Sequence, residues 1–330
     1  MILIITLISF VIGVGFAYFV SEYGLRFGFI DIPNNRSSHK EITPRGGGFG
    51  IPIALLFVFM FFIKDYYIVI FISIVLSFFS LIDDKISLPA FLRFIVEIVF
   101  ASVIIVVYKN DLIKSVKFNY ALIVVVFMIV LLAFIITAAT NFFNFMDGIN
   151  GIAGIEAIIS FSFIAVYTGC IVDNQSVFLI AISIIASSIG FLIFNFPKAR
   201  VFMGDTGSIF IGFLFASLVV ILAKDIKELL VLLSFQGAFY IDCIITIFIR
   251  IYRKENILRP HLQHLYQRLI HQKKMSHVKV TVLYCILQII IGIMSLLFLT
   301  KSVIWIVSFW LLLIVLYVIV REKLNKINGV

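Results

Sequence analysis

The sequence predicts an all-α integral membrane protein with about eleven transmembrane helices, and its composition carries that prediction. Hydrophobic residues make up 63% of the 330 residues, and charged residues only 13%. The mean hydropathy of +1.20 lies far above that of a soluble domain. The chain is therefore expected to fold within a lipid bilayer.

Eleven apolar runs are long enough, or nearly so, to cross a bilayer as helices. They lie at residues 2–20, 47–63, 66–82, 88–107, 121–139, 152–172, 176–196, 208–223, 229–249, 280–299 and 302–320. The first run is too long for a signal-peptide core and follows no basic residue, so it is expected to remain as a span. Because the run at 208–223 is short, the expected number of transmembrane helices is ten or eleven. No low-complexity linker interrupts the chain, so residues 1–330 are expected to form one domain.

The loops on the two sides of the predicted bundle differ in charge. Threading eleven spans alternately places 19 of the 26 Lys and Arg residues on one side and 7 on the other. The positive-inside rule makes the richer side cytoplasmic. All five histidines and every motif described below fall on that side. Membrane orientation and anionic substrates thus explain the net charge of +9 better than nucleic acid does.

Residues 195–208, NFPKARVFMGDTGS, place polar side chains between two apolar runs. Asp205 and two glycines stand where the next helix would begin. Free N–H groups and the helix dipole could hold a phosphate there, while Asp205 binds a divalent cation. The alternative is a turn in which Asp205 caps the helix.

The first cytoplasmic loop, DIPNNRSSHKEITPRGGGFG, is basic and rich in glycine. Its cations, Arg45 among them, match anionic oxygens, and its glycines allow close approach of the backbone to a phosphate or nucleotide. A flexible positive-inside loop is the alternative. The loop matches no Walker or dinucleotide-binding pattern.

Acidic side chains mark the next cytoplasmic turn. Asp83 and Asp84 directly follow an apolar run, and two adjacent carboxylates repel one another unless a cation or a shared proton compensates. A metal-assisted phosphoryl site and a simple pair of interfacial acids are both open. Arg93 and Glu97 lie four residues apart on the next run and are expected to pair with each other.

The loop NFFNFMDGINGIAG contains Asn144 and Asp147 among four hydrogen-bonding side chains. Amides and a carboxylate at these spacings can bind a nucleobase, a ribose or an acetamido group, although Asn and Gly also simply form turns. The density of such side chains, without a basic residue, favours a site.

The last large loop contains His261 and His264, which would share a face of a helix and could contact a metal, a phosphate or a sugar hydroxyl. Solvated surface histidines are the alternative. The spacing is too short for a zinc-protease signature. Cys170, Cys243 and Cys285 show no CxxC spacing, so no disulfide framework or zinc site is indicated.

Taken together, these stretches resemble the polyprenyl-phosphate N-acetylhexosamine-1-phosphate transferases, from Asp31 to about Leu269. The matching stretches, in family order, are PNNRSSHKEITPRGGG, the Asp83–Asp84 pair, NFFNFMDGINGIAG, NFPKARVFMGDTGS and RPHLQHLYQRL. The first and last resemble the branch that initiates O-antigen or capsule units. Transferases of phospho-MurNAc-pentapeptide and those that initiate teichoic acid are alternatives within the family. Asn150 replaces a usual acid, which leaves the nucleobase contacts or the choice of donor in question.

The resemblance implies an enzyme of the bacterial inner membrane whose active site faces the cytoplasm. It would transfer an N-acetylaminosugar-1-phosphate from a UDP-sugar to undecaprenyl phosphate, release UMP, and initiate O-antigen or another cell-surface polysaccharide such as cell-wall polymers. Mg²⁺ is the implied cofactor, with Mn²⁺ as a substitute. Its partners would be the two substrates and membrane lipids, and a homodimer is left open.

The resemblance also implies roles for individual residues. Asp205 would ligate the metal, and Asp83 and Asp84 would hold the acceptor phosphate, one of them taking its proton. Substrate-binding residues would be Arg45, Asn144, Asp147, Asn195, Phe202, His261 and His264. Of these, Phe202 could stack on uracil, whereas Arg45 and the histidines would bind phosphate or sugar.

A membrane transporter is the alternative of a different class. Its pathway would use the ionisable residues inside the apolar runs, namely Arg93, Glu97 and Asp242. Such a pathway predicts charges spread through the depth of the membrane. Most candidates instead gather at one face, which favours an enzyme that works at the interface.

Overall fold

The computed structural model describes residues 1–33, 41–86, 88–109, 121–256, 259 and 261–327. Within these ranges, nine helices are long and apolar enough to cross a membrane, and two shorter apolar helices span Gly47–Phe62 and Tyr67–Asp83. Each of the eleven coincides with one predicted run. The prediction of an all-α integral membrane protein of about eleven helices is therefore confirmed.

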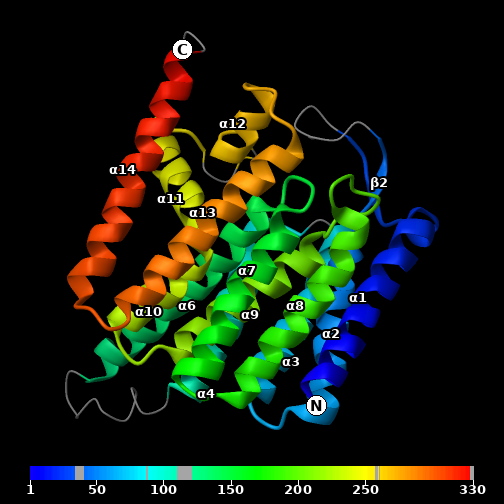
Figure 1. Cartoon of the computed structure of the whole chain (residues 1–330), viewed down its shortest axis with the longest axis horizontal. Coiled ribbons are helices and arrows are strands. Elements are labelled where there is room, and N and C mark those ends of the chain that lie inside the picture. Colours follow the sequence, from blue (N-terminus) through cyan, green and yellow to red (C-terminus); the bar gives the residue numbers. More distant parts are fainter. Residues whose placement is uncertain (34–40, 87, 110–120, 257–258, 260, 328–330) are drawn as a thin grey trace.

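The α-helices form a bundle, with the short α12 at one end of it (Figure 1). They are α1 (Ile2–Tyr23), α2 (Gly50–Phe62), α3 (Tyr67–Ile86), α4 (Ala90–Tyr108), α6 (Ala121–Met146), α7 (Ile152–Val166), α8 (Gln175–Asn195), α9 (Asp205–Leu222), α10 (Ile226–Leu233), α11 (Gly237–Tyr252), α12 (Leu265–His271), α13 (His277–Phe298) and α14 (Val303–Ile327). Four short helices are η1 (Gly24–Phe27), η2 (Gly47–Phe49), η3 (Tyr167–Ile171) and η4 (Ser234–Gln236). Strands β1 (Ile30–Asp31) and β2 (Thr43–Pro44) form a small antiparallel pair.

Helix α9 forms the centre of the bundle, where it packs against α3 and α6. Almost all of its residues are buried, unlike those of the lipid-facing α14. Gly212 allows α6 to approach closely, because an added Cβ would lie 3.0 Å from the Thr140 carbonyl oxygen. Small residues at such contacts let helices pack in the absence of a hydrophobic driving force within lipid. The tight core fixes the position at which α9 begins.

Two helix boundaries differ from the predicted ones at positions that matter for the site. Helix α6 continues to Met146, so Asn144 lies on its last turn and not in a loop. Helix α9 already begins at Asp205, and its N-cap residue is Gly204. The interpretation of Asp205 as a helix cap is therefore wrong. Hydropathy alone ends a span where polar residues begin, whereas a helix continues while its side chains find partners.

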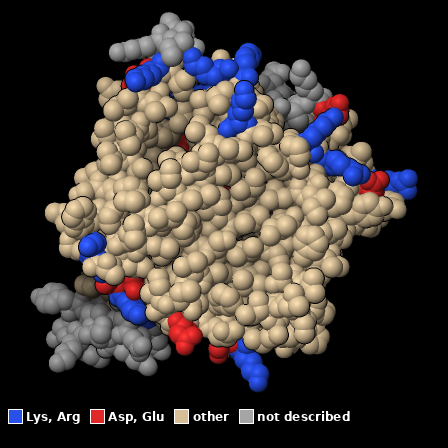
Figure 2. Space-filling view, in the orientation of Figure 1, with Lys and Arg blue, Asp and Glu red and all other residues tan. Residues whose placement is uncertain are grey.

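The ends of α3 and α6 and the start of α9 lie at the same end of the bundle as β2 and α12, termed the basic end (Figure 1). Lys and Arg side chains gather at this end in Figure 2, above a broad belt with little charge. The chain begins at the opposite end, whereas α14 ends at the basic end. This arrangement agrees with an odd number of spans and with the predicted charge asymmetry.

Candidate active site

Arg93 joins two acids that come from different helices at the basic end. Its guanidinium lies 3.0 Å from Asp83 Oδ2, at the end of α3, and 3.8 Å from Asp205 Oδ2, at the start of α9. Asp83 also accepts the Leu88 N–H at 2.7 Å. The Asp83 side chain is 6% exposed, against 33% for Asp205. Asp205 is thus the more accessible carboxylate of the pair.

The expected ion pair between Arg93 and Glu97 is not formed. Glu97 instead accepts a hydrogen bond from the Asn141 side chain on α6 at 2.5 Å. Spacing along α4 brings Arg93 and Glu97 to one face of that helix, but the packing of α3 and α9 places other carboxylates closer to the guanidinium. Sequence reasoning therefore missed the role of Arg93 in joining α3 to α9.

Asp205 is held in place from two sides. The Asn144 side chain donates to Asp205 Oδ1 at 3.1 Å and to Ser208 Oγ at 2.9 Å, so α6 and α9 are joined at their polar ends. Arg93 approaches the other carboxylate oxygen. The charge also lies in the first turn of α9, where the helix dipole favours an anion. These contacts fix a carboxylate at the membrane interface and leave part of it open.

Asp147 follows α6 and adds a second carboxylate next to Asp205. It is half-buried and has neither a hydrogen bond nor an ion pair from its side chain within the described residues. Burial, and then the nearby charge of Asp205, raise the pKa of the Asp147 carboxyl from 3.8 to about 7. Two acids that repel each other in this way favour the binding of a cation or a proton between them.

The acids at this site fit a magnesium ion that takes some of its ligands from the protein and the others from a bound substrate. Mg²⁺ is typically bound by one or two carboxylates together with phosphates and water. Asp205 and Asp147 supply that donor chemistry. Among the described residues, no group of three or more His, Cys, Asp or Glu side chains is arranged to hold a metal without other ligands. The metal itself stays a prediction.

The glycine-rich turn of the first loop packs against the loop that precedes α9. Gly47 N–H donates to the Phe202 carbonyl at 2.9 Å, and Gly48 N–H donates to the Met203 carbonyl at 3.1 Å. Arg45 pairs with Phe202 along the same contact. The glycines therefore allow the two loops to approach each other, and they bring Arg45 and Phe202 side by side at the basic end.

Asn195 holds the main chain of its own region. It is 6% exposed, its Oδ1 accepts the Gly151 N–H at 2.7 Å, and its amide donates to the Val201 carbonyl at 2.9 Å. Asn150 adds a second link, because its amide donates to the Pro197 carbonyl at 3.1 Å. An ionised acid at position 150 could not donate this bond. Both amides thus connect the loop after α6 with the loop after α8.

The two histidines meet at the start of α12, although not on one helical face as predicted. His261 precedes the helix and His264 is its N-cap residue, yet their ring centroids lie 4.9 Å apart. His264 is buried, and its Nδ1 lies 3.2 Å from an oxygen of Asp242 on α11. Burial, followed by the charges of His264 and Arg250, lowers the pKa of His261 to about 4. His261 is therefore neutral at physiological pH.

Two further predictions concern Asp84 with the first loop, and the ionisable residues of the transport alternative. The side chain of Asp84 lies outside the described residues, as do residues 34–40 of the first loop. The three ionisable residues of the transport alternative all lie toward the basic end: Arg93 contacts Asp205, Glu97 is one turn further along α4, and Asp242 bonds to α12. Sequence reasoning assigned Asp242 only to that alternative and missed its contact with His264. The one sequence feature that could have indicated a role was its position inside an apolar run.

A comparison with protein families matches the region that contributes Asp83, Arg93, Asn144, Asp147 and Asp205. The sequence model of glycosyl transferase family 4 matches residues 66–223, which include α3 through α9. The chain is 27% identical to a probable undecaprenyl-phosphate N-acetylglucosaminyl 1-phosphate transferase of Bacillus subtilis, over 94% of this chain and 88% of that protein.

Two further relatives cover less. An undecaprenyl-phosphate alpha-N-acetylglucosaminyl 1-phosphate transferase of Salmonella typhi is 28% identical, over 60% of this chain and 56% of that protein. A phospho-N-acetylmuramoyl-pentapeptide-transferase of Endomicrobium trichonymphae is 37% identical, over 36% of this chain and 32% of that protein.

Proposed function

Because this chain belongs to the polyprenyl-phosphate N-acetylhexosamine-1-phosphate transferases of glycosyl transferase family 4, we propose that it transfers an N-acetylaminosugar-1-phosphate from a UDP-sugar to undecaprenyl phosphate. The products are undecaprenyl-diphosphate-sugar and UMP. The observation that carries this proposal is the cluster of Asp83, Arg93, Asn144, Asp147 and Asp205, which four helices bring together at the basic end.

UDP-N-acetylglucosamine is the first donor to test. The names of the Bacillus and Salmonella relatives specify N-acetylglucosaminyl 1-phosphate, and the Bacillus similarity extends over 94% of this chain. The pentapeptide-transferase similarity of 37% identity extends over only 36% of it. Initiation of O-antigen or another cell-surface polysaccharide follows as the biological role, since the lipid-linked sugar is the product on which such a polymer is built.

In the proposed reaction, an oxygen of the lipid phosphate attacks the phosphorus that carries the sugar. The bond between that phosphorus and the oxygen bridging to UMP breaks, and UMP leaves with the electron pair. The phosphate of the lipid substrate lies at the membrane interface, whereas the nucleotide sugar binds from the aqueous phase. A basic membrane surface can collect both anions.

The residues of the site would have different roles according to their positions. Mg²⁺ or Mn²⁺, held by Asp205 with Asp147 nearby, would neutralise charge on the diphosphate. Arg93 holds Asp83 and Asp205 in the free protein, and its guanidinium can also bind a phosphate. Asp83 and Asp84 would orient the acceptor, one of them taking its proton. Asn144 orients Asp205, so that the carboxylate needs little rearrangement when substrate binds.

The nucleotide and sugar would lie beside the paired loops and the histidines. The main chains of Phe202 and Arg45 pair there, which supports the proposal that the ring would stack on uracil and the cation would bind phosphate. Neutral His261 can donate a hydrogen bond to a phosphate or sugar oxygen. Asn195 would act indirectly, since its amide is bonded to main-chain groups on both sides.

The test uses the purified full chain with undecaprenyl phosphate, a panel of UDP-linked N-acetylaminosugars, and Mg²⁺ or EDTA. We expect release of UMP with UDP-N-acetylglucosamine in Mg²⁺ and none in EDTA. Asp205→Asn should lower turnover by about a hundredfold or more. The matched control is Asp65→Asn, because Asp65 bonds to Ser176 away from this cluster and its loss should leave turnover unchanged. An absence of UMP release with every donor would contradict the proposal.

A further inference from the structure

We propose that Asp242 is a positioning residue of this transferase: it orients the His264 imidazole with a proton on Nδ1 and thereby places His261 to donate from Nε2 to the substrate. The inference rests on the proposed function, because it assigns the residue a part in that reaction. Asp242 lies on α11 and is completely buried. It reaches the histidines only through the fold, since His264 lies 22 residues further along the chain.

The Asp242 carboxylate is surrounded by donors. Besides the His264 ring, Asp242 accepts hydrogen bonds from two main-chain N–H groups and three hydroxyl groups. The donors are Leu265 N at 3.0 Å, Tyr266 N at 3.4 Å, Tyr284 OH at 2.5 Å, Tyr317 OH at 2.8 Å and Thr246 Oγ1 at 3.3 Å. A buried carboxylate is costly unless such bonds compensate it, and here four helices supply them.

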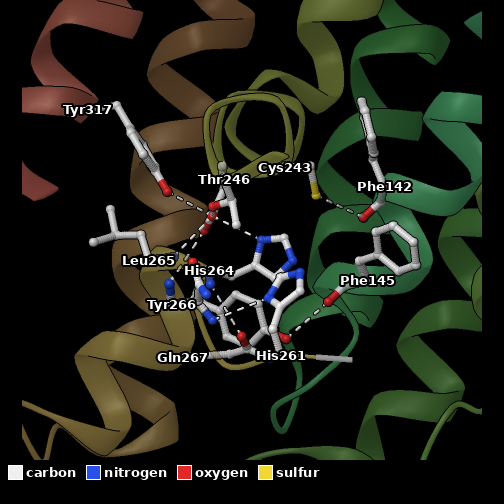
Figure 3. A network of polar contacts seen from close by, with 12 residues as sticks. Phe142, Phe145, Cys243, Thr246, His261, His264, Leu265, Tyr266, Gln267 and Tyr317 are labelled. Atoms are coloured by element: carbon white, nitrogen blue, oxygen red, sulfur yellow. Dashed lines mark hydrogen bonds and ion pairs between the residues drawn. The ribbon is translucent and has the colours of Figure 1, made fainter. Parts of the chain in front are cut away.

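Asp242 also fixes the first turn of α12. This helix has seven residues and would not be stable by itself. The Leu265 and Tyr266 N–H groups, which have no partner inside the helix, donate to Asp242. Tyr266 OH in turn donates to the Phe145 carbonyl at 3.0 Å, which ties α12 to the polar end of α6 (Figure 3).

The contact with Asp242 determines which nitrogen of His264 carries the proton. Its Nδ1 faces Asp242 Oδ1 at 3.2 Å, and an ionised carboxylate can only accept, so Nδ1 carries a proton. The His264 side chain also accepts the Gln267 N–H in a capping box. Where the two bonds compete for one ring nitrogen, the bond to the buried carboxylate is the stronger. The ring is thereby held in one orientation.

The His264 ring in turn packs against His261. The two rings lie side by side, 4.9 Å apart and inclined by 35° (Figure 3). His261 Nδ1 accepts the Gln263 N–H at 3.3 Å, so the proton of the neutral ring is on Nε2. His261 is only half-buried. It can therefore offer its Nε2 proton to a ligand, while the His264 ring, which Asp242 orients, packs against it.

A double-mutant cycle tests this chain of contacts. Asp242→Asn keeps the shape of the side chain and removes its charge, and His261→Gln removes the imidazole. We expect each substitution to lower kcat/KM about tenfold to a hundredfold, mainly through kcat. The kcat/KM of the double variant should be no more than about twofold below that of the less active single variant, because Asp242 acts through the His261 imidazole. Asp225→Asn, the same chemical change at the N-cap of α10, should leave kcat/KM unchanged.

Three outcomes would overturn the inference. They are Asp242→Asn with unchanged kcat/KM, losses that multiply in the double variant, and a loss of thermal stability with normal kcat per folded molecule. If Asp242→Asn does not fold, the wild-type protein still decides the question. Its ¹⁵N-labelled histidines should show His264, identified by comparison with His264→Gln, protonated at Nδ1, and a neutral His264 ring protonated only at Nε2 would contradict the proposal.

Failure of this inference and failure of the proposed function can be told apart. A wild-type protein that releases no UMP with any donor contradicts the function itself. An active wild-type protein whose Asp242→Asn variant is equally active contradicts only the role of Asp242. The tautomer measurement needs no activity, so it tests the positioning contact in either case.

Discussion

At the scale of single residues, the site is a set of charges that balance only in part. Arg93 neutralises Asp83 at 3.0 Å and lies within 3.8 Å of Asp205. Asp147 gains no such partner within the described residues, and its carboxyl has a pKa raised to about 7. Natural sites often retain an uncompensated charge where a ligand must bind, at a cost to stability.

Removing the Asp147 charge should therefore stabilise the metal-free protein at high pH. The native pKa of about 7 exceeds the ordinary 3.8 of the unfolded chain, so the native state loses stability as the pH rises through 7. In EDTA, we expect Asp147→Asn to melt about 2 °C or more above wild type at pH 8, and the difference from wild type to be clearly smaller at pH 5. Thermal unfolding in detergent at both pH values measures this.

The control for that prediction is Asp65→Asn, which removes a carboxylate bonded to Ser176. It should leave the pH dependence of unfolding as in wild type. A parallel shift of Asp147→Asn at both pH values would contradict the argument, because a pH-independent gain cannot come from the titration of this carboxyl. Turnover of Asp147→Asn should fall, since the proposed function has this charge beside the metal that Asp205 would hold.

At the scale of elements, the start of α9 is fixed by two loops that fit together without side chains between them. Gly204 has φ of 74° and ψ of 165°, a conformation almost restricted to glycine. A Cβ there would also lie 2.8 Å from the Gly46 nitrogen. The glycine-rich turn and the loop before α9 thus form one unit that sets where Asp205 lies.

Gly204→Ala should consequently damage both stability and turnover. The backbone conformation alone costs about 1–3 kcal/mol, and the contact with Gly46 adds to it. Gly15→Ala is the matched control, because no atom lies within 4 Å of the added Cβ in the middle of α1. That variant should be neutral or slightly stabilised. Thermal unfolding and UMP release are the measurements, and equal effects of the two substitutions would exclude this account.

At the scale of the whole molecule, charge and chemistry lie at one end of the bundle. The predicted positive-inside count, the gathering of Lys and Arg in Figure 2, and the site residues all identify the basic end. The chain crosses from the opposite end at its start to the basic end at the end of α14 (Figure 1). This distribution predicts that the basic end faces the cytoplasm.

Cysteine labelling tests that orientation. The three native cysteines are replaced, and Lys224→Cys or Lys279→Cys is introduced at an exposed position before α10 or within the first turn of α13. A membrane-impermeant maleimide should label position 224 in intact spheroplasts and position 279 only after the membrane is disrupted. The reverse pattern would place the active site outside the cell and would contradict the predicted topology.

The sequence by itself determined the number of membrane helices and the order of the motifs. A span is a local property, since about twenty consecutive apolar residues suffice to cross a bilayer. The eleven predicted runs therefore coincide with the eleven apolar helices among the described residues. The order of motifs and the count of basic residues likewise depend only on position along the chain.

Only the tertiary structure decided which polar groups meet. Arg93 pairs with Asp83 and Asp205, and not with Glu97, because the packing of α3, α4 and α9 sets those distances. Asp242 bonds to His264 because the loop after α11 folds α12 back against that helix, which the spacing of 22 residues does not indicate. Such contacts depend on helix packing between distant segments, and no spacing along one helix contains that information.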